Sequence, residues 1–302
     1  MRKIKIYGAG SIGNHLAHAS RNLGYEVLIS DIDEDALRRT KEEIYPDRYG
    51  KWDDSIRLSL VKEIPADEYF DVVFIGTPPD THMALALKTL KEETPKVLLI
   101  EKPLCTPDLK NAQALFEASE ASDTTVLVGY NHGLGDNTVE MERLMAEGVI
   151  GTAITLYGGI HEHWGGIFKA HPWLSGPSDT YLGFAGRGGG ACGEHSHGIH
   201  IWQHFAHLLG KGKIVEVSAI MDIVDDGKVN YDSFCNLNLR TEKGFVGTVA
   251  QDVITAPAKK YMKLQGDAGF LEWHVNYSSE GDAVMVSRDG KEGEVNILPK
   301  TR

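Results

Sequence analysis

Cysteine is scarce in this chain, and no long apolar run is present. The three cysteines, Cys105, Cys192 and Cys235, lie far apart and match no zinc or disulfide spacing, which favours a reducing cytoplasm. Since no apolar run is long enough to cross a bilayer and the first residues have a strand pattern, we expect neither a membrane span nor a signal peptide. The chain has 31 lysines and arginines against 43 aspartates and glutamates. The resulting net charge of −12 argues against nucleic-acid or anionic-membrane partners.

The first thirty residues contain a dinucleotide-binding fingerprint. A β-type run, residues 3–7, leads directly into GAGSIG, where Gly8, Gly10 and Gly13 have the G-x-G-x-x-G spacing. A helical pattern and a second apolar run follow, ending at Asp31. These glycines permit the tight turn, the approach of the pyrophosphate and close helix–strand packing, and the helix N-terminus faces the phosphates. A carboxylate at the ribose repels a 2′-phosphate, so we expect NAD as cofactor, with NADP less favoured; a βαβ unit without ligand is the alternative.

Strands and helices continue to alternate up to about residue 131. Near-continuous Val/Ile/Leu strands separated by amphipathic helices predict a parallel sheet covered on both faces. Ligands of such sheets bind at the carboxyl ends of the strands, where Thr77, Pro78, Lys102 and Asn131 fall. The expected strands are residues 71–79, 96–104 and 124–131, with helical patterns at 81–91 and 108–119.

The motifs of this first half, taken in order, resemble those of the glucose–fructose oxidoreductase / inositol dehydrogenase / MocA family. They are GAGSIG, Asp31, GTPPDTH at 76–82, EKPL at 101–104 and VGYN at 128–131. The resemblance implies an α/β protein with an N-terminal Rossmann domain, residues 1–131. It also implies a C-terminal α+β domain, residues 132–302, whose large open, mostly antiparallel sheet forms a homodimer or homotetramer.

The resemblance further implies that Lys102 reaches the active site, near the nicotinamide ribose and the substrate, and that Pro103 fixes the backbone after it. The residues expected to bind the cofactor are Gly8, Gly10, Ser11, Ile12, Gly13, Asp31, Ile32, Thr77, Pro78, His82, Glu101, Lys102 and Asn131.

After about residue 138 the pattern becomes β-rich. A helical pattern at 139–151 is followed by β-type runs joined by short polar turns, which predicts an antiparallel sheet. Residues 164–190 form a long irregular segment, and such segments are usually functional. The expected strands are residues 152–163, 214–224, 232–242, 244–255, 260–267 and 270–275.

The stretch GGGACGEHSHGIHIWQHF, residues 188–205, contains the candidate acid/base histidine. Family members have here an aspartate and, four residues later, a histidine that faces the substrate. Alignment from the glycines places Glu194 at the aspartate and Gly198 at the histidine. Alignment from the following helix places Ser196 and His200 there, and we prefer it. The acidic partner is then missing, replaced by Ser196, or supplied by Glu194 one turn earlier.

The histidines of this stretch follow helical spacing. His197, His200, His204 and His207 share one stripe. A second stripe on roughly the opposite side is apolar and should face the sheet; its residues are Ile199, Trp202, Ala206 and Leu209. Two alternatives to acid/base catalysis remain. The side chains of Glu194, His197 and His200 have types and spacing that can ligate zinc, although we expect no metal, and the stripe can also be a solvated polar face. For His204 and His207 the solvated face is favoured.

We therefore predict an NAD-dependent oxidoreductase that acts on a hydroxyl or ketone of a sugar, sugar derivative or cyclitol. Because histidine titrates near neutral pH, we expect His200 to exchange the hydroxyl proton, with His197 or Glu194 nearby, while Lys102 hydrogen-bonds the reacting oxygen. The rival hypothesis is a regulatory protein that binds the dinucleotide without turnover, and a metal-dependent enzyme is the lesser one. Residues expected to contact the substrate are Tyr130, His161, His163, Trp164, Trp173 and Arg187.

Overall fold

The computed structural model describes residues 2–299, and the chain divides into two compact units. The first unit is Met1–Gly129 and the second is Tyr130–Arg302, so the division falls two residues before the boundary expected from the sequence. Within the described residues, no helix has the length and apolar character that crossing a membrane requires.

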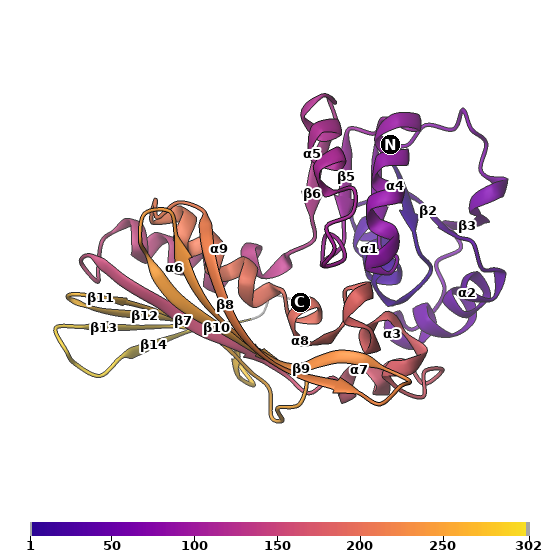
Figure 1. The fold of residues 1–302 in the computed structure, drawn as a ribbon. Helices are drawn as coiled ribbons and strands as arrows, with labels where there is room; N and C mark the ends of the chain where they lie inside the picture. The colour runs from indigo at the N-terminus through magenta and orange to yellow at the C-terminus, as the bar shows by residue number, and fades with distance from the viewer. Residues whose placement is uncertain (1, 300–302) are drawn as a thin grey trace. The chain divides into compact units, whose positions relative to one another are not determined.

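The first unit is a six-stranded sheet with the strand order β3-β2-β1-β4-β5-β6, and every neighbouring pair is parallel (Figure 1). This is the doubly wound arrangement that the alternating sequence predicted, with β3 as a strand that the sequence reading missed. Its elements are β1 (Lys3–Tyr7), α1 (Ser11–Asn22), β2 (Glu26–Asp31), α2 (Glu34–Arg39), the π-helical turn η1 (Thr40–Ile44), α3 (Tyr45–Tyr49), β3 (Ile56–Leu60), the short turn η2 (Val61–Glu63), β4 (Val72–Ile75), α4 (Pro79–Glu92), β5 (Val97–Ile100), α5 (Ala112–Glu120) and β6 (Thr125–Val128).

Burial on both faces explains why the strands of this unit are rich in Val, Ile and Leu. On one face, Ile4 and Ile6 of β1 pack in a cluster with Ala17 of α1 and Leu37 of α2. On the other face, strands β4 and β5 pack against helices α4 and α5. Both layers are mostly apolar, with Lys5 of β1 as a buried exception that pairs with Glu93.

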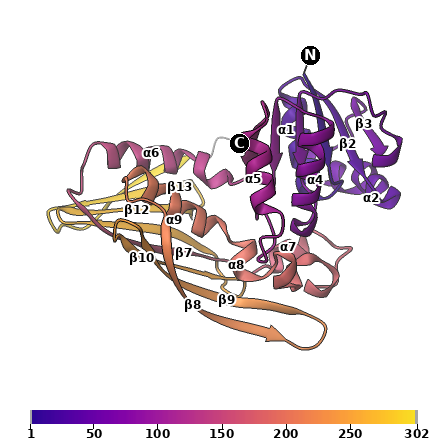
Figure 2. The same ribbon diagram turned by 45° about the horizontal axis from the view of Figure 1, so that its top comes forward.

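The second unit contains an eight-stranded sheet with the order β14-β13-β12-β11-β7-β10-β9-β8 (Figure 2). Its pairs are antiparallel except for β7 and β10. Its elements are the turn η3 (Asn131–Leu134), α6 (Asp136–Ala146), β7 (Ala153–His161), α7 (Gly165–Lys169), the turns η4 (Pro177–Asp179), η5 (Tyr181–Gly183) and η6 (Ala185–Arg187), α8 (Gly190–Glu194), α9 (His197–Leu208), β8 (Ile214–Asp225), β9 (Asn230–Thr241), β10 (Val246–Asp252), β11 (Lys259–Gly266), β12 (Gly269–Ser278), β13 (Gly281–Arg288) and β14 (Glu294–Pro299).

Helix α9 packs on this sheet through its apolar side. Ile201, Trp202, Phe205 and Ala206 are buried in the main core cluster, and the indole N–H of Trp202 donates to the Leu156 carbonyl at 2.8 Å. The histidine stripe is consequently turned away from the sheet. The predicted apolar stripe of Ile199, Trp202, Ala206 and Leu209 is thus partly right, since Ile199 and Leu209 are only partly buried at its margins.

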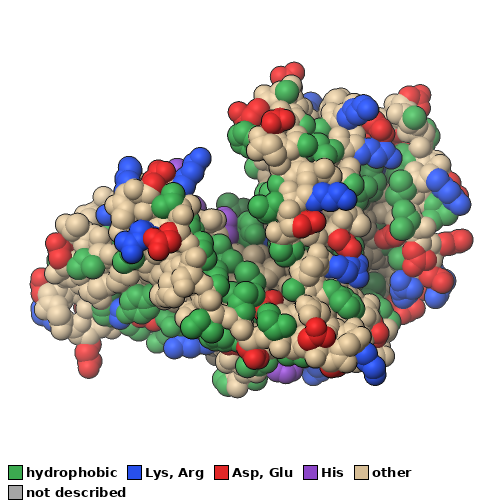
Figure 3. All heavy atoms as spheres, in the orientation of Figure 1, with side chains coloured by type: hydrophobic (Ala, Val, Ile, Leu, Met, Phe, Trp, Pro, Cys, Tyr) green, Lys and Arg blue, Asp and Glu red, His purple; other side chains and the backbone are tan. Residues whose placement is uncertain are grey.

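The edge strand β8 has apolar side chains in the open. Val215, Val217, Ile220 and Ile223 are each more than half exposed, and Met221 is 41% exposed. Hydrophobic side chains are visible along this strand in the space-filling view (Figure 3). A long edge strand with exposed apolar residues favours association, because the backbone groups on its outer edge have no strand partner and its apolar side chains are in contact with water.

Candidate active site

The glycine-rich loop between β1 and α1 has the geometry of a phosphate-binding turn. Gly8 has φ +103°, and a Cβ there would come within 2.8 Å of the Gly76 carbonyl oxygen. A Cβ on Gly13 would lie 2.0 Å from the carbonyl oxygen of Gly8, so only glycine allows this helix to pack so closely. Gly10 is different, since a Cβ there meets nothing within 4 Å. Its open surface, at the N-cap of α1, leaves room for a pyrophosphate.

Asp31 is fixed beside this loop at the end of β2. Its Oδ2 accepts a hydrogen bond from the Ala9 N–H at 2.8 Å, and its Oδ1 accepts from the Ile32 and Asp33 N–H groups at 2.7 and 3.1 Å. These bonds hold the carboxylate in one orientation next to the glycines. Oδ2 has one of these donors and Oδ1 has two, so acceptor capacity for the ribose hydroxyls remains on Oδ2.

The carboxyl ends of β4, β5 and β6 lie side by side at the same edge of the sheet, because these strands are parallel neighbours. After β5, the Glu101 N–H donates to the Ile75 carbonyl at 2.9 Å and the Lys102 N–H donates to Glu101 Oε2 at 3.2 Å. A Cβ on Gly129, after β6, would lie 2.8 Å from Glu101 Oε1. The Glu101 carboxylate thus occupies the space that Gly129 leaves, and Lys102 begins the loop from a defined position.

His82 is completely buried beneath this edge. Its Nδ1 lies 3.0 Å from the Pro103 carbonyl oxygen and its Nε2 lies 2.7 Å from the Thr77 carbonyl oxygen. Burial lowers the pKa of His82, and the carbonyl contacts oppose that change. Because the ring links the loop after β4 to the loop after β5, we propose that it serves the cofactor site by positioning these loops, without touching the cofactor.

The remaining expected cofactor residues of the first unit lie at the same loops. Ser11 and Ile12 begin α1, and Ile12 is 39% exposed. Ile32 is 88% exposed after Asp31. The Thr77 and Thr81 hydroxyls are 2.7 Å apart, and Pro78 is the N-cap of α4. In the second unit, Asn131 is exposed at the start of η3.

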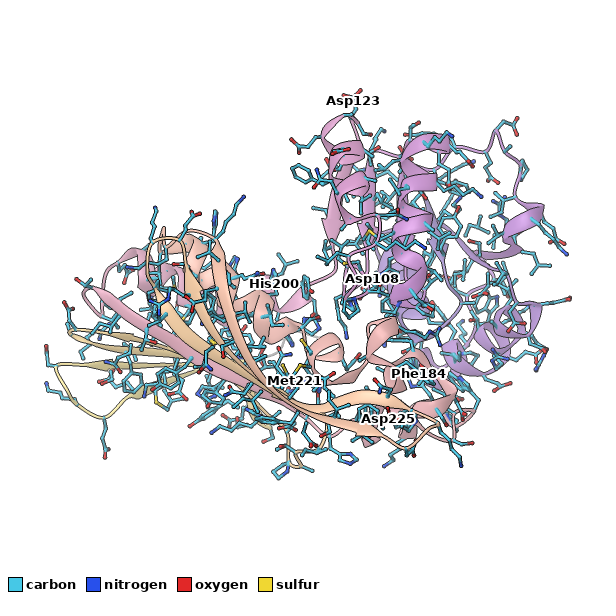
Figure 4. All side chains as sticks on the ribbon, in the orientation of Figure 1. Asp108, Asp123, Phe184, His200, Met221 and Asp225 are labelled. Carbon is cyan, nitrogen blue, oxygen red and sulfur yellow. The ribbon has the colours of Figure 1, made fainter. Side chains whose placement is uncertain are left out.

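His200 lies on the first turns of α9 and is labelled in Figure 4. Its ring stacks on Tyr130 with the centroids 4.4 Å apart and the planes 4° from parallel. The Tyr130 hydroxyl donates to Ser196 Oγ at 3.3 Å, so the residue at the preferred aspartate position binds the aromatic ring beneath the histidine. Sequence reasoning included Tyr130 as a substrate residue and did not foresee this stack.

The environment of His200 favours its neutral form. Burial, reinforced by the nearby His204 ring, lowers the pKa of His200 to about 4. Its Nδ1 is buried and has no hydrogen-bond partner among the described residues. The sequence reading expected titration near neutral pH, and the structure corrects this, because the imidazole loses water on stacking and gains no carboxylate.

The other histidines of the stripe have separate environments. The rings of His197 and His132 lie 4.5 Å apart, and His197 meets Tyr130 edge-on at 5.6 Å. The Nε2 of His204 lies 2.6 Å from a carboxylate oxygen of Glu142 on α6. His207 is exposed at the end of α9. His132, which was not among the residues expected from the sequence, therefore joins the histidine group.

Glu194 does not lie on the same helix as His200. Helix α8 ends at Glu194, and α9 begins at His197 after a break at His195 and Ser196. The expectation that Glu194 lies one turn before His200 on the same helix is wrong, since α8 is a separate short helix that begins at Gly190. The Tyr181 hydroxyl donates to Glu194 Oε2 at 3.4 Å. Within residues 2–299, no group of three or more His, Cys, Asp or Glu side chains is arranged to hold a metal ion.

The expected substrate residues are spread over different surroundings. His161 Nδ1 lies 2.6 Å from Asp252 Oδ2, and the two residues pair in register on β7 and β10. The Gly165 N–H donates to the exposed His163. Trp164 is only 8% exposed and packs with Leu182, Ala191 and Val253, whereas Trp173 is 38% exposed and Arg187 is exposed on η6.

Comparison with known proteins agrees with this geometry. Residues 2–130 match the model described as "Oxidoreductase family, NAD-binding Rossmann fold", and residues 138–272 match the "GFO/IDH/MocA C-terminal domain". The fold and its glycine-rich edge define a nicotinamide-dinucleotide oxidoreductase. The chain belongs to the Gfo/Idh/MocA oxidoreductase family, and its first unit is an NAD-binding Rossmann domain. No curated protein matches it.

Solved structures share this fold over nearly the whole chain. Levoglucosan dehydrogenase in complex with NADH and levoglucosan is 17% identical, with a TM-score of 0.75 and coverage of 98% of this chain and 80% of that one. An oxidoreductase from Agrobacterium radiobacter with NAD+, L-tartaric acid and magnesium is 19% identical, with a TM-score of 0.72 and coverage of 99% and 80%. The WlbA dehydrogenase from Bordetella pertussis, with NADH and UDP-GlcNAcA, is 15% identical, with a TM-score of 0.72 and coverage of 99% and 78%.

Proposed function

We propose that this oxidoreductase transfers hydride between NAD and a hydroxyl or ketone carbon of a sugar, sugar derivative or cyclitol. The observation that carries the cofactor assignment is the Asp31 carboxylate, which three backbone N–H groups fix beside the open face of Gly10. The substrate class is supported by similar structures, whose ligands include levoglucosan and UDP-GlcNAcA. NAD, when bound, supplies the hydride acceptor, and the residues of the chain supply binding, orientation and proton transfer.

His200 is our candidate for the acid/base residue. The neutral imidazole is the form that accepts a hydroxyl proton, and burial favours that form of His200. Lys102 is our candidate for the group that hydrogen-bonds the reacting oxygen, because it follows β5 in a loop whose start is fixed by Glu101. His197 is the second candidate for proton transfer, and Glu194 the candidate for its partner.

Two measurements on the same samples distinguish binding from turnover. The protein is mixed with NAD and a panel of sugars, sugar acids, cyclitols and sugar nucleotides, first by thermal shift and then by NADH absorbance. A ligand that binds the folded state raises the melting temperature, and turnover of that ligand must produce NADH. A protein that binds NAD and a sugar without producing or consuming NADH under any condition would be a regulatory binding protein, and our proposal would be wrong.

We propose, in addition, that the chain forms a homodimer or homotetramer through the sheet of the second unit and works in a reducing cytoplasm. The exposed apolar side chains of β8 support association. The three cysteines are free thiols, which suits a reducing compartment. Light scattering on protein eluted from a size-exclusion column measures the oligomeric state directly. A monomer at micromolar concentration would contradict the proposed homodimer or homotetramer.

A further inference from the structure

His200 is held by a short segment that the sequence places directly after the first unit. Tyr130 supplies the ring on which the imidazole stacks, with centroids 4.4 Å apart, and the η3 turn begins at the next residue. Within η3, Gly133 lies against the edge of the same imidazole. An added Cβ at Gly133 would be 2.9 Å from His200 Cε1 and 3.9 Å from each ring nitrogen.

We propose that Gly133 is a positioning residue for His200, since the missing side chain leaves the space in which the imidazole lies flat on Tyr130. This inference rests on the proposed function, in which His200 transfers the proton. The backbone of Gly133 gives no other reason for glycine, because its φ lies outside the left-handed region that favours glycine. The requirement therefore comes from the contact with the imidazole.

The turn cannot easily move away to admit a larger residue. The hydroxyl of Thr138, on α6, donates to the His132 carbonyl at 2.7 Å. The same hydroxyl accepts from the indole N–H of the fully buried Trp273 at 2.9 Å. This chain of bonds ties η3 to the core of the second unit, so the imidazole is the group that yields.

The imidazole has limited room to yield. Tyr130 covers one face of the ring, and the ring of His204 lies near-parallel with its centroid 6.0 Å away. His204 is itself held by the Glu142 carboxylate at 2.6 Å. A methyl group at position 133 should therefore displace the His200 ring by roughly 0.5 Å or more, to reach an ordinary carbon–carbon contact of about 3.5 Å. Misplacement of a reacting group by about 1 Å can cost ~10²-fold in rate.

The test is Gly133→Ala, with Leu134→Ala as the matched control. Leu134 belongs to the same turn, and its side chain is 84% exposed. We expect Gly133→Ala to lower kcat at least tenfold, while the dissociation constant of NAD and the melting temperature stay near those of the parent. Leu134→Ala should keep kcat within threefold. A Gly133→Ala enzyme with kcat within threefold of the parent would overturn the inference.

Two further measurements separate this inference from the proposed function. In a His200→Ala background, Gly133→Ala should cause no additional loss of kcat, and a further loss of tenfold would mean that Gly133 acts on another group. If His200→Ala alone leaves kcat within threefold, the role proposed for His200 fails, whatever the result at Gly133.

If Gly133→Ala does not fold, the test is made on the unsubstituted protein. Proton NMR must then show the His200 ring protons shifted upfield by the Tyr130 ring, and their absence from that position would overturn the inference.

Discussion

The fixed carboxylate of Asp31 predicts a strong preference for NAD over NADP. A 2′-phosphate at the ribose would lie beside this carboxylate, and its Coulomb repulsion amounts to about 1–4 kcal/mol per pair of unit charges at about 4 Å, depending on solvent screening. The arginines on α2 do not offset this repulsion, because Arg38 pairs with Asp35 and Glu42 and Arg39 pairs with Asp33. We expect NADP(H) to bind roughly 10- to 1,000-fold more weakly than NAD(H).

The Asp31→Asn substitution should reduce the preference for NAD by two effects, tighter binding of NADP and weaker binding of NAD. The amide loses the negative charge that repels the phosphate, so NADP binding should tighten. It also loses the charged acceptor for ribose hydroxyls, where a hydrogen bond is worth about 1.5–3 kcal/mol, so NAD binding should weaken about tenfold or more. The hydrogen bond from the Ala9 N–H to Oδ2 of residue 31 is lost if the amide –NH2 takes the place of Oδ2. A modest decrease in melting temperature should accompany the change.

Fluorescence titration with NADH and NADPH measures both affinities. Glu34→Gln is the matched control, since it removes one exposed negative charge from the first turn of α2 and leaves the Asp31 hydrogen bonds intact. The reasoning fails if the parent binds NADPH as tightly as NADH. It also fails if Glu34→Gln changes the ratio of the two affinities as much as Asp31→Asn, because a general field effect would then replace the local one.

Three further predictions concern catalysis and pH. Lys102→Ala should keep the fold, since the residue follows a strand end, and should lose most turnover; kcat within threefold of the parent would remove it from the mechanism. His200→Ala should lower kcat roughly 10²-fold or more with NAD affinity nearly unchanged. A severe loss of kcat in His197→Ala with a mild one in His200→Ala would favour the other register. Activity that is lost with EDTA and restored by zinc would favour a metal site. The unfolded chain binds a proton at His200 near pH 6.5 and the folded chain only near pH 4, so stability should fall as pH falls through this window, and His200→Gln should reduce that fall in melting temperature; an unchanged slope would contradict the low pKa.

Local patterns in the sequence were sufficient for most of the fold. The predicted run at 3–7 coincides with β1, and the run at 214–224 corresponds to β8, which extends one residue further. β13, GDAVMVSR, was missed although its centre is apolar, and the other missed strands have weaker patterns: β3 is IRLSL, and β14 is EVNILP at the sheet edge. Strands of this kind are stabilised by the neighbour with which they pair, so their own periodicity gives a weak signal.

The site divides in the same way. Gly8, Gly13 and Asp31 were predictable, because backbone geometry within about thirty residues dictates them. The surroundings of His82 and Trp164 were not, since each depends on contacts with distant segments. His82 binds a carbonyl 21 residues away, and Trp164 joins a core cluster with Leu182 and Val253. Sequence identifies the residue type needed at a turn, whereas burial and pairing of a side chain are decided by tertiary packing.

In the preferred register Ser196 stands where the family pattern has an aspartate, and the surroundings of His200 suit this difference. A carboxylate four residues before His200 would stabilise the imidazolium and raise the pKa of the ring. This chain has Ser196 there, and its hydroxyl accepts a hydrogen bond from Tyr130. Without the carboxylate the imidazole can be buried as a neutral ring, and Tyr130 on its face and Gly133 at its edge form a site for such a ring. We therefore propose that Ser196 and Gly133 are parts of one arrangement, in which stacking on Tyr130, in place of an ion pair, orients His200.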